Sequence, residues 1–320
     1  MKKKIGIAGF LVGTAQDENA LTGVSVILAP EGATAGCDVR GNAPGTRETD
    51  LLKSEKTVDK IHAVVLSGGS AFGLESACGV MDYLEEEGIG FDVQVAKVPI
   101  VAGAVLFDLA VGDPKVRPDK EMGYRAAKSA NTEIEIGNVG GGCGATVGKL
   151  RGFGSVMKGG TGYYELETEE GLRVGAYVCV NACGEVYEGE EILAGVLNKE
   201  GTKILPAREL MMGQERASLQ GANTTIGCII TNACLAKAQC NRVAQTAHNG
   251  YALSIRPVHT GMDGDTIFCM ASGEVPADAD KVSYLAQEAM KEAVLSAILS
   301  AEKVADIESC SSLRQKKVRG

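Results

Sequence analysis

Short apolar runs alternate with longer amphipathic segments along the chain. The runs are rich in β-branched residues and stop at charged or turn-forming residues, which is typical of strands buried on both faces. We expect such strands at 24–30, 61–69, 174–182 and 226–233. The longer segments predict helices over about 72–87, 235–252 and 278–303.

Segment 278–303 has the clearest helical period. Its small and aliphatic residues recur every three or four positions and mark one face: Val282, Leu285, Ala286, Ala289, Ala293 and Ala297. Strands buried on both faces, combined with several helices, predict a layered α/β fold. The chain shows no internal repeat and no Pro- or Ser-rich linker, so we expect a single domain over 1–320, with 188–222 as an exposed connector.

The charge and the apolar content exclude several classes of protein. A formal net charge of −9 without a basic patch argues against nucleic-acid binding. No apolar stretch reaches the ~18 residues that a membrane span needs. The start, MKKKIGIAGFLVGTAQ, is similar to a signal peptide, but Gly6, Gly9 and Gly13 interrupt its apolar run. We therefore expect a first strand or loop and a cytoplasmic protein.

The ten cysteines follow no disulfide framework. Cys179 and Cys183 are four positions apart, and no second pair at zinc-site spacing accompanies them. We expect free buried thiols in a reducing compartment, no metal and no cofactor.

The glycine-rich stretch GNVGGGCGATVGKL (137–150) departs from both phosphate-binding motifs. Cys143 stands where a Walker loop needs glycine, and Leu150 follows Lys149 where Ser or Thr is needed. A dinucleotide fingerprint would need glycine in place of Val147. Two interpretations remain open. The loop amides and Lys149 approach another negative charge, or Lys149 lies in a flexible surface loop.

A pair of carboxylates occurs in HTGMDGDTIF (259–268). Asp263 and Asp265 are two positions apart, so an extended backbone places both on one face, where each shifts the pKa of the other. The local alternative is a hairpin with a tight Asp-Gly turn. A calcium loop is not indicated, because Thr266, Ile267 and Phe268 supply no alternating oxygen ligands.

The chain has only three histidines, at 62, 248 and 259, and none lies beside a nucleophile-elbow pattern. A Ser-His-Asp hydrolase is therefore not indicated, and Cys143 as a nucleophile has no stronger support. GANTTIGCII (221–230) suggests another chemistry. A threonine that becomes an N-terminus attacks with its own α-amine as general base, and Thr224 would be freed by cutting Asn223–Thr224. The alternatives are a glycosylation sequon or a plain loop that enters a strand.

Several long motifs resemble one family in order along the chain. They include LTGVSVILAPEGATAGCDVRGNAPGTRETDLL, LSGGSAFGLESACGVMDYLEEEGIGF, GNVGGGCGATVGKL, VGAYVCVNACGEV and NTTIGCIITNACLAKAQCNRVAQTAHNGYALSIRPVHTGMDGDTIF. These stretches, from about residue 12 to 300, resemble the L-aminopeptidase/D-esterase family of N-terminal-nucleophile hydrolases. Asn-Thr at the junction and Asp-Gly-Asp downstream are similar to its nylon-oligomer hydrolase branch.

The resemblance implies a four-layer α/β/β/α sandwich and self-cleavage into fragments 1–223 and 224–320 that stay together. It also implies a homotetramer of these cleaved heterodimers. Thr224 matches the nucleophile, Asp263 and Asp265 match the carboxylates that hold its amine and hydroxyl, and Asn181 with Lys149 matches the oxyanion stabilisers. Cys143 departs from the small hydroxyl residue expected at that position, and its role is open.

We therefore expect a self-processing N-terminal-threonine amidohydrolase or aminopeptidase. Its substrates would be small peptides, amino-acid amides or ω-amino-acid oligomers of the 6-aminohexanoate type. The alternatives are an acyltransferase like ornithine acetyltransferase, which also exposes a threonine, and a non-catalytic scaffold that does not cut itself.

Overall fold

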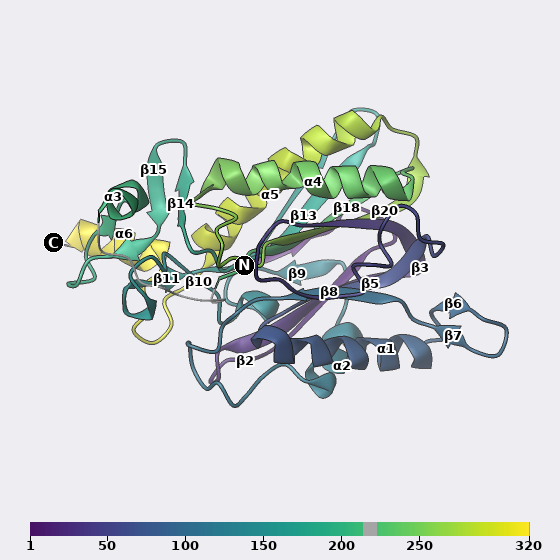
Figure 1. Cartoon of the computed structure of the whole chain (residues 1–320), viewed down its shortest axis with the longest axis horizontal. Coiled ribbons are helices and arrows are strands. Elements are labelled where there is room, and N and C mark those ends of the chain that lie inside the picture. Colours follow the sequence, from purple (N-terminus) through teal and green to yellow (C-terminus); the bar gives the residue numbers. More distant parts are fainter. Residues whose placement is uncertain (214–222, 320) are drawn as a thin grey trace.

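Four layers make up the molecule, with helices outside and strands inside (Figure 1). The computed structural model describes residues 1–213 and 223–319. Helices α4 (Lys237–Ser254) and α5 (Ala279–Ser300) cover one side of the strands. Helices α1 (Ser76–Glu86) and α2 (Lys120–Lys128) cover the opposite side. The expected α/β/β/α sandwich is confirmed.

One hydrogen-bonded sheet supplies both inner layers. Its strand order is β12-β13-β18-β20-β3-β5-β8-β4, with β2 also paired to β3. The bounds in this order are Gly160–Glu167, Arg173–Val180, Ile226–Ala233, Thr266–Val275, Thr22–Val39, Lys60–Ser67, Val101–Val105 and Gly45–Arg47, and β2 is Leu11–Asp17.

The long strand β3 folds this sheet over on itself. Residues 24–28 pair with β5, the register shifts between Leu28 and Ala33, and residues 34–39 pair with β20. The two halves of β3 therefore belong to different layers. A core cluster lies between them and draws side chains from both, among them Ile27, Leu66, Tyr177, Ile230 and Phe268.

Short elements complete the chain. The small sheets are β1 (Lys2–Lys4) with β9 (Glu133–Glu135), β6 (Phe91–Asp92) with β7 (Lys97–Val98), β10 (Thr146–Val147) with β11 (Met157–Lys158), β14 (Glu185–Glu188) with β15 (Glu191–Ala194) and β19 (Ile255–Arg256), and β16 (Val196–Leu197) with β17 (Ile204–Leu205). The remaining helices are α3 (Ala207–Met212), α6 (Cys310–Arg319) and the 3-10 turns η1 (Ser70–Glu75), η2 (Gly140–Gly142) and η3 (Phe153–Ser155).

Most of the predicted elements are present. All four strands and the helices at 235–252 and 278–303 are confirmed, and the face marked in the last helix packs into the core. The helix expected over 72–87 starts as the 3-10 turn η1, because Gly73 passes so close to Gly68 that a Cβ would lie 1.9 Å from its carbonyl oxygen.

The exposed connector predicted over 188–222 is wrong for its described part. Residues 188–213 contain β15, β16, β17 and α3, and Leu193, Ala194, Val196 and Ala207 are buried there. Short alternating strands in a polar stretch carry too weak a period to be recognised. Residues 214–222 of this prediction lie outside the described part of the chain.

Two further observations concern the cysteines and the helices. The nine cysteines other than Cys310 are free thiols, and six of these nine are buried. Within residues 1–213 and 223–319, no helix is long and apolar enough to cross a membrane.

The close approach of α5 to β12 gives a stability prediction. A Cβ on Gly162 would lie 2.0 Å from the Ala293 carbonyl oxygen, whereas one on Gly154 would have no atom within 4 Å. We expect Gly162→Ala to lower the free energy of unfolding by about 1–3 kcal/mol through overpacking, and Gly154→Ala to change it by less than about 0.5 kcal/mol. Denaturant unfolding measures both, and equal values would contradict the close contact.

Candidate active site

Two segments that are far apart in the sequence meet where parallel strands begin. Strands β18 and β20 pair in parallel, with Ile226 opposite Thr266. The residues just before each strand therefore lie side by side, and Asn223 forms a parallel bridge with Asp263. This pairing brings the Asn-Thr-Thr stretch against the Asp-Gly-Asp stretch.

The peptide group before Thr224 is surrounded by hydrogen-bonding groups. The Gly264 N–H donates to the Asn223 carbonyl oxygen at 3.1 Å and to Thr224 Oγ at 3.2 Å. The Thr224 hydroxyl also donates to the Asn223 carbonyl oxygen. The Thr224 N–H donates to the Asn181 carbonyl oxygen at 3.1 Å. A hydroxyl and an N–H donor thus meet at one buried carbonyl.

Gly264 has to be glycine for this arrangement. A Cβ at this position would lie 2.8 Å from Thr224 Oγ and 2.7 Å from the Ala43 carbonyl oxygen. Both contacts are below the approach that real Cβ atoms make, and one of the two atoms belongs to backbone. The hydroxyl of Thr224 therefore lies directly against the backbone of Gly264.

Lys149 is fully buried beside this junction. Its Nζ donates to the carbonyl oxygens of Thr146 and Asn181 at 2.8 and 2.7 Å, and to Asn181 Oδ1 at 2.8 Å. Burial lowers the pKa of Lys149 to about 7, and the charge of Asp263 partly opposes that shift. The interpretation as a surface lysine is wrong, because the glycine-rich loop folds inward and carries Lys149 with it.

Asn181 connects Lys149 to Thr224. Its carbonyl oxygen accepts from both Lys149 Nζ and the Thr224 N–H. Its side chain is held at both ends, since Oδ1 accepts the Thr146 N–H at 3.0 Å and Nδ2 donates to the Phe107 carbonyl oxygen at 3.0 Å. Asn181 contacts Thr224 through its main chain, a detail that sequence motifs do not carry.

The two aspartates are each 2% exposed. Asp265 Oδ1 accepts the Thr225 N–H at 2.7 Å, and Asp263 Oδ2 accepts the Thr260 N–H at 2.6 Å. Desolvation, followed by the charge of Asp265, raises the pKa of Asp263. Both residues precede β20 in a loop that bridges to Asn223, so the interpretation as a hairpin turn is wrong.

One histidine lies in this site. His259 Nδ1 is 2.8 Å from Asp265 Oδ2, and the His259 N–H donates to the same oxygen at 3.2 Å. His259 was assigned no role from the sequence, because no nucleophile stands next to it in the chain. The available signal was its position four residues before Asp263. The other two histidines lie on β5 and α4.

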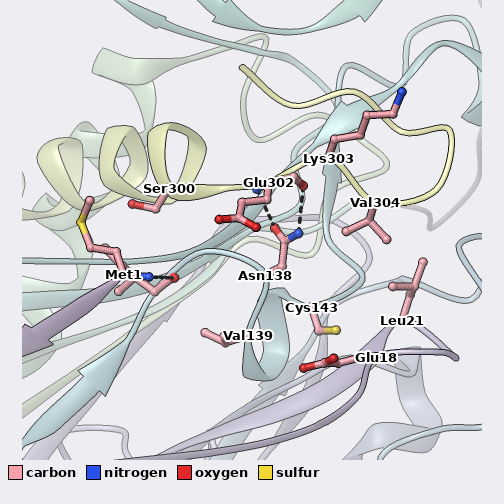
Figure 2. Close-up of a pocket in the computed structure, with 11 residues that line it drawn as sticks. Met1, Glu18, Leu21, Asn138, Val139, Cys143, Ser300, Glu302, Lys303 and Val304 are labelled. Atoms are coloured by element: carbon pink, nitrogen blue, oxygen red, sulfur yellow. Dashed lines mark hydrogen bonds between the residues drawn. The ribbon is translucent and has the colours of Figure 1, made fainter. Parts of the chain in front are cut away.

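A separate cavity of about 470 Å³ lies near the other end of the glycine-rich loop (Figure 2). Its wall includes Cys143, Glu18, Leu21 and Asn138, together with the chain after α5. None of the five residues proposed for catalysis lines it. Burial raises the pKa of the Cys143 thiol to about 11, which disfavours the thiolate that a cysteine nucleophile needs.

Known proteins resemble this chain over most of its length. The family model of Peptidase family S58 matches residues 5–310. An uncharacterized aminopeptidase from Mycobacterium leprae is 41% identical over 312 residues, covering 89% of this chain and 84% of the relative. A 6-aminohexanoate-oligomer endohydrolase from Kocuria sp. (strain KY2) is 30% identical, covering 90% of this chain and 84% of the relative.

Solved structures share the fold. The L-aminopeptidase D-Ala-esterase/amidase from Ochrobactrum anthropi, described as a variant of the Ntn hydrolase fold, superposes with a TM-score of 0.71 at 18% identity. The alignment covers 98% of this chain and 92% of that structure. A β-aminopeptidase from Burkholderia sp. gives a TM-score of 0.68 at 21% identity, with the same coverage. The chain therefore belongs to Peptidase family S58, and it is a hydrolase of amide bonds.

Proposed function

We propose that Thr224 is the nucleophile of an N-terminal-threonine aminopeptidase that first cuts its own Asn223–Thr224 bond. One observation carries this proposal. The Thr224 hydroxyl and the Gly264 N–H both meet the Asn223 carbonyl oxygen in a buried site. A nucleophile beside a carbonyl, with a donor aimed at the oxygen that gains charge, is the arrangement that acyl transfer requires.

Self-cleavage would proceed through an ester. Thr224 Oγ bonds to the Asn223 carbonyl carbon, the Gly264 N–H stabilises the oxygen, and the carbon–nitrogen bond to Thr224 breaks. The hydroxyl proton ends on the Thr224 nitrogen, which becomes a free amine. Water then hydrolyses the ester, which restores the hydroxyl and leaves a carboxylate on Asn223. The products are fragments 1–223 and 224–320.

Substrate hydrolysis would repeat this chemistry with the free amine as general base. The amine takes the Oγ proton, Oγ attacks the substrate carbonyl, and the proton passes to the leaving amine. Water then hydrolyses the acyl-enzyme, which releases the acid and restores the Thr224 hydroxyl. The Asn181 carbonyl oxygen would orient the amine, since it already accepts from both Lys149 and Thr224, and the positive charge of Lys149 would stabilise the oxyanion. Asp263 and Asp265 would hold the nucleophile from the opposite side.

The substrates that we propose are small amides with a free amino end. This choice follows the names of the relatives, which are aminopeptidases and 6-aminohexanoate-oligomer endohydrolases. Small peptides, amino-acid amides and linear ω-amino-acid oligomers all have an acyl group that carries a free amine. The proposed site would transfer this acyl group to Thr224. We further propose a cytoplasmic homotetramer of cleaved heterodimers. Free thiols support the cytoplasmic location, and the exposed apolar side chains Phe91 and Val95 support the assembly.

Intact-mass spectrometry tests self-cleavage directly. We expect the wild-type chain to give two fragments that meet between Asn223 and Thr224, and Thr224→Ala to stay at 33.2 kDa because it lacks the hydroxyl. Thr224→Ser keeps a hydroxyl and is expected to be cut. The wild-type protein should release amine from an amino-acid amide, and Thr224→Ala should retain less than about 1% of that rate. An uncut wild type without hydrolysis would favour the scaffold alternative.

The proposed role of Lys149 depends on its charge, which unfolding measurements can follow. Because burial lowers the pKa of Lys149 to about 7, the unfolded chain binds the extra proton between about pH 7 and the ordinary value of 10.5. This group therefore makes the folded chain less stable at low pH, and the penalty shrinks as pH rises. In a Thr224→Ala background, adding Lys149→Met should raise the free energy of unfolding more at pH 7 than at pH 9, by about 1.4 kcal/mol per pH unit.

The matched control is Lys199→Met in the same background, since Lys199 is exposed. Its effect should be the same at both pH values. A constant difference between the Lys149→Met chain and its parent from pH 7 to 9 would show that Lys149 keeps its proton throughout.

A further inference from the structure

His259 makes two of the hydrogen bonds that hold the Asp265 carboxylate. Its backbone N–H and its ring Nδ1 both meet Asp265 Oδ2, at 3.2 and 2.8 Å, while Asp265 Oδ1 accepts the Thr225 N–H at 2.7 Å. Because a carboxylate only accepts, Nδ1 has to carry the proton in this contact. The two oxygens are thus fixed from opposite sides, one by His259 and one by Thr225.

Thr225 directly follows the proposed nucleophile. Its N–H is held by Asp265, and its carbonyl oxygen accepts the Thr266 N–H at 3.2 Å. A rotation of the Asp265 carboxylate would move the acceptor that fixes the backbone after Thr224. The side chain of His259 therefore affects the orientation of the nucleophile through two intermediate residues, Asp265 and Thr225.

His259 is itself held firmly. Its backbone has a φ of 53°, in the left-handed region that few residues other than Gly adopt, with Asn, Asp and His the commonest among them. Its ring packs on two rings of α4, with centroids 4.9 Å from His248 and 6.3 Å from Tyr251. His248 is anchored in turn by a contact of 3.1 Å between its Nε2 and the Asp38 carbonyl oxygen. A strained residue with a packed ring, beside a buried carboxylate, is typical of a functional site.

We propose that His259 is a positioning residue for this hydrolase, and that its Nδ1–H fixes the Asp265 carboxylate and through it the backbone at Thr224. The inference rests on the proposed function of Thr224. Placement errors of about 1 Å at a reacting centre reduce rates by about 100-fold. Loss of the Nδ1 contact should therefore act on kcat and on the rate of self-cleavage, and leave KM for the substrate nearly unchanged.

Three variants separate the hydrogen bond from the packing. His259→Asn places an amide nitrogen near the position of Nδ1 and tolerates the left-handed backbone. His259→Gln places its amide near the position of Nε2, beyond reach of Asp265, and His259→Ala removes the side chain. The measurements are fragment formation by intact mass, and kcat and KM for an amino-acid amide on the processed protein. Thermal unfolding of each variant reports the fold.

We expect His259→Ala and His259→Gln to lower kcat and the self-cleavage rate by about 10- to 100-fold, with KM within about 2-fold of wild type. His259→Asn should recover to within about 5-fold of the wild-type rates. If His259→Ala does not fold, the contrast between Asn and Gln decides. Equal rates in Asn and Gln, or a change confined to KM, would overturn the inference.

The failure of the proposed function has a different signature. A wild-type chain that neither cuts itself nor hydrolyses the amide would overturn both proposals together. An active wild type whose three variants all retain its rates would overturn the role of His259 alone.

Discussion

The parallel pairing of β18 with β20 is the constraint on which the site depends. Parallel strands run in the same direction, so their starting ends lie at one edge of the sheet, and the segments before them are brought together. This places Gly264 beside the Asn223 carbonyl although 40 positions separate Gly264 from Thr224. The hydrogen-bond donor is therefore the main-chain N–H of Gly264, and side chains only adjust its position. A fixed main-chain donor needs no reorganisation when charge develops on the oxygen.

Several polar and ionisable groups are buried around this edge of the sheet, and burial and neighbouring charges shift their pKa values. Lys149 is lowered in pKa by burial, whereas Asp263 is raised by burial and by its neighbour Asp265. Each is driven toward its neutral form, and their mutual attraction works against that. A buried lysine held by carbonyl oxygens, with buried carboxylates close enough to affect its pKa, gathers ionisable groups where solvent does not reach them. Burying these groups costs free energy of folding. Ionisable groups with shifted pKa values cluster at functional sites, which fits a site for acyl transfer.

Much of the fold could be predicted because its main elements carry strong periods. Strand 226–233 and the alanine face of 278–303 are examples in which burial is visible in the residue pattern alone. The fold-over of β3 was not visible, since a register shift at Leu28 depends on partners far away in the chain. Lys149 was ambiguous because a lysine among glycines looks exposed until its three carbonyl acceptors are known. His259 escaped notice because its partner becomes apparent only when the loop is folded.

The interleaving of strands has a consequence for the order of events in the life of the chain. β18 lies between β13 and β20, and β20 lies between β18 and β3, so the two strands from after residue 224 are inserted as a pair between strands from before it. The Gly264 donor reaches the Asn223 carbonyl and the Thr224 hydroxyl only when β18 and β20 have paired. Under the proposed mechanism, an immature chain cannot cut itself, and a cut chain has already completed its folding. Cleavage would therefore follow the formation of the sheet. It would break the Asn223–Thr224 peptide bond, and the sheet would still hold the two fragments together.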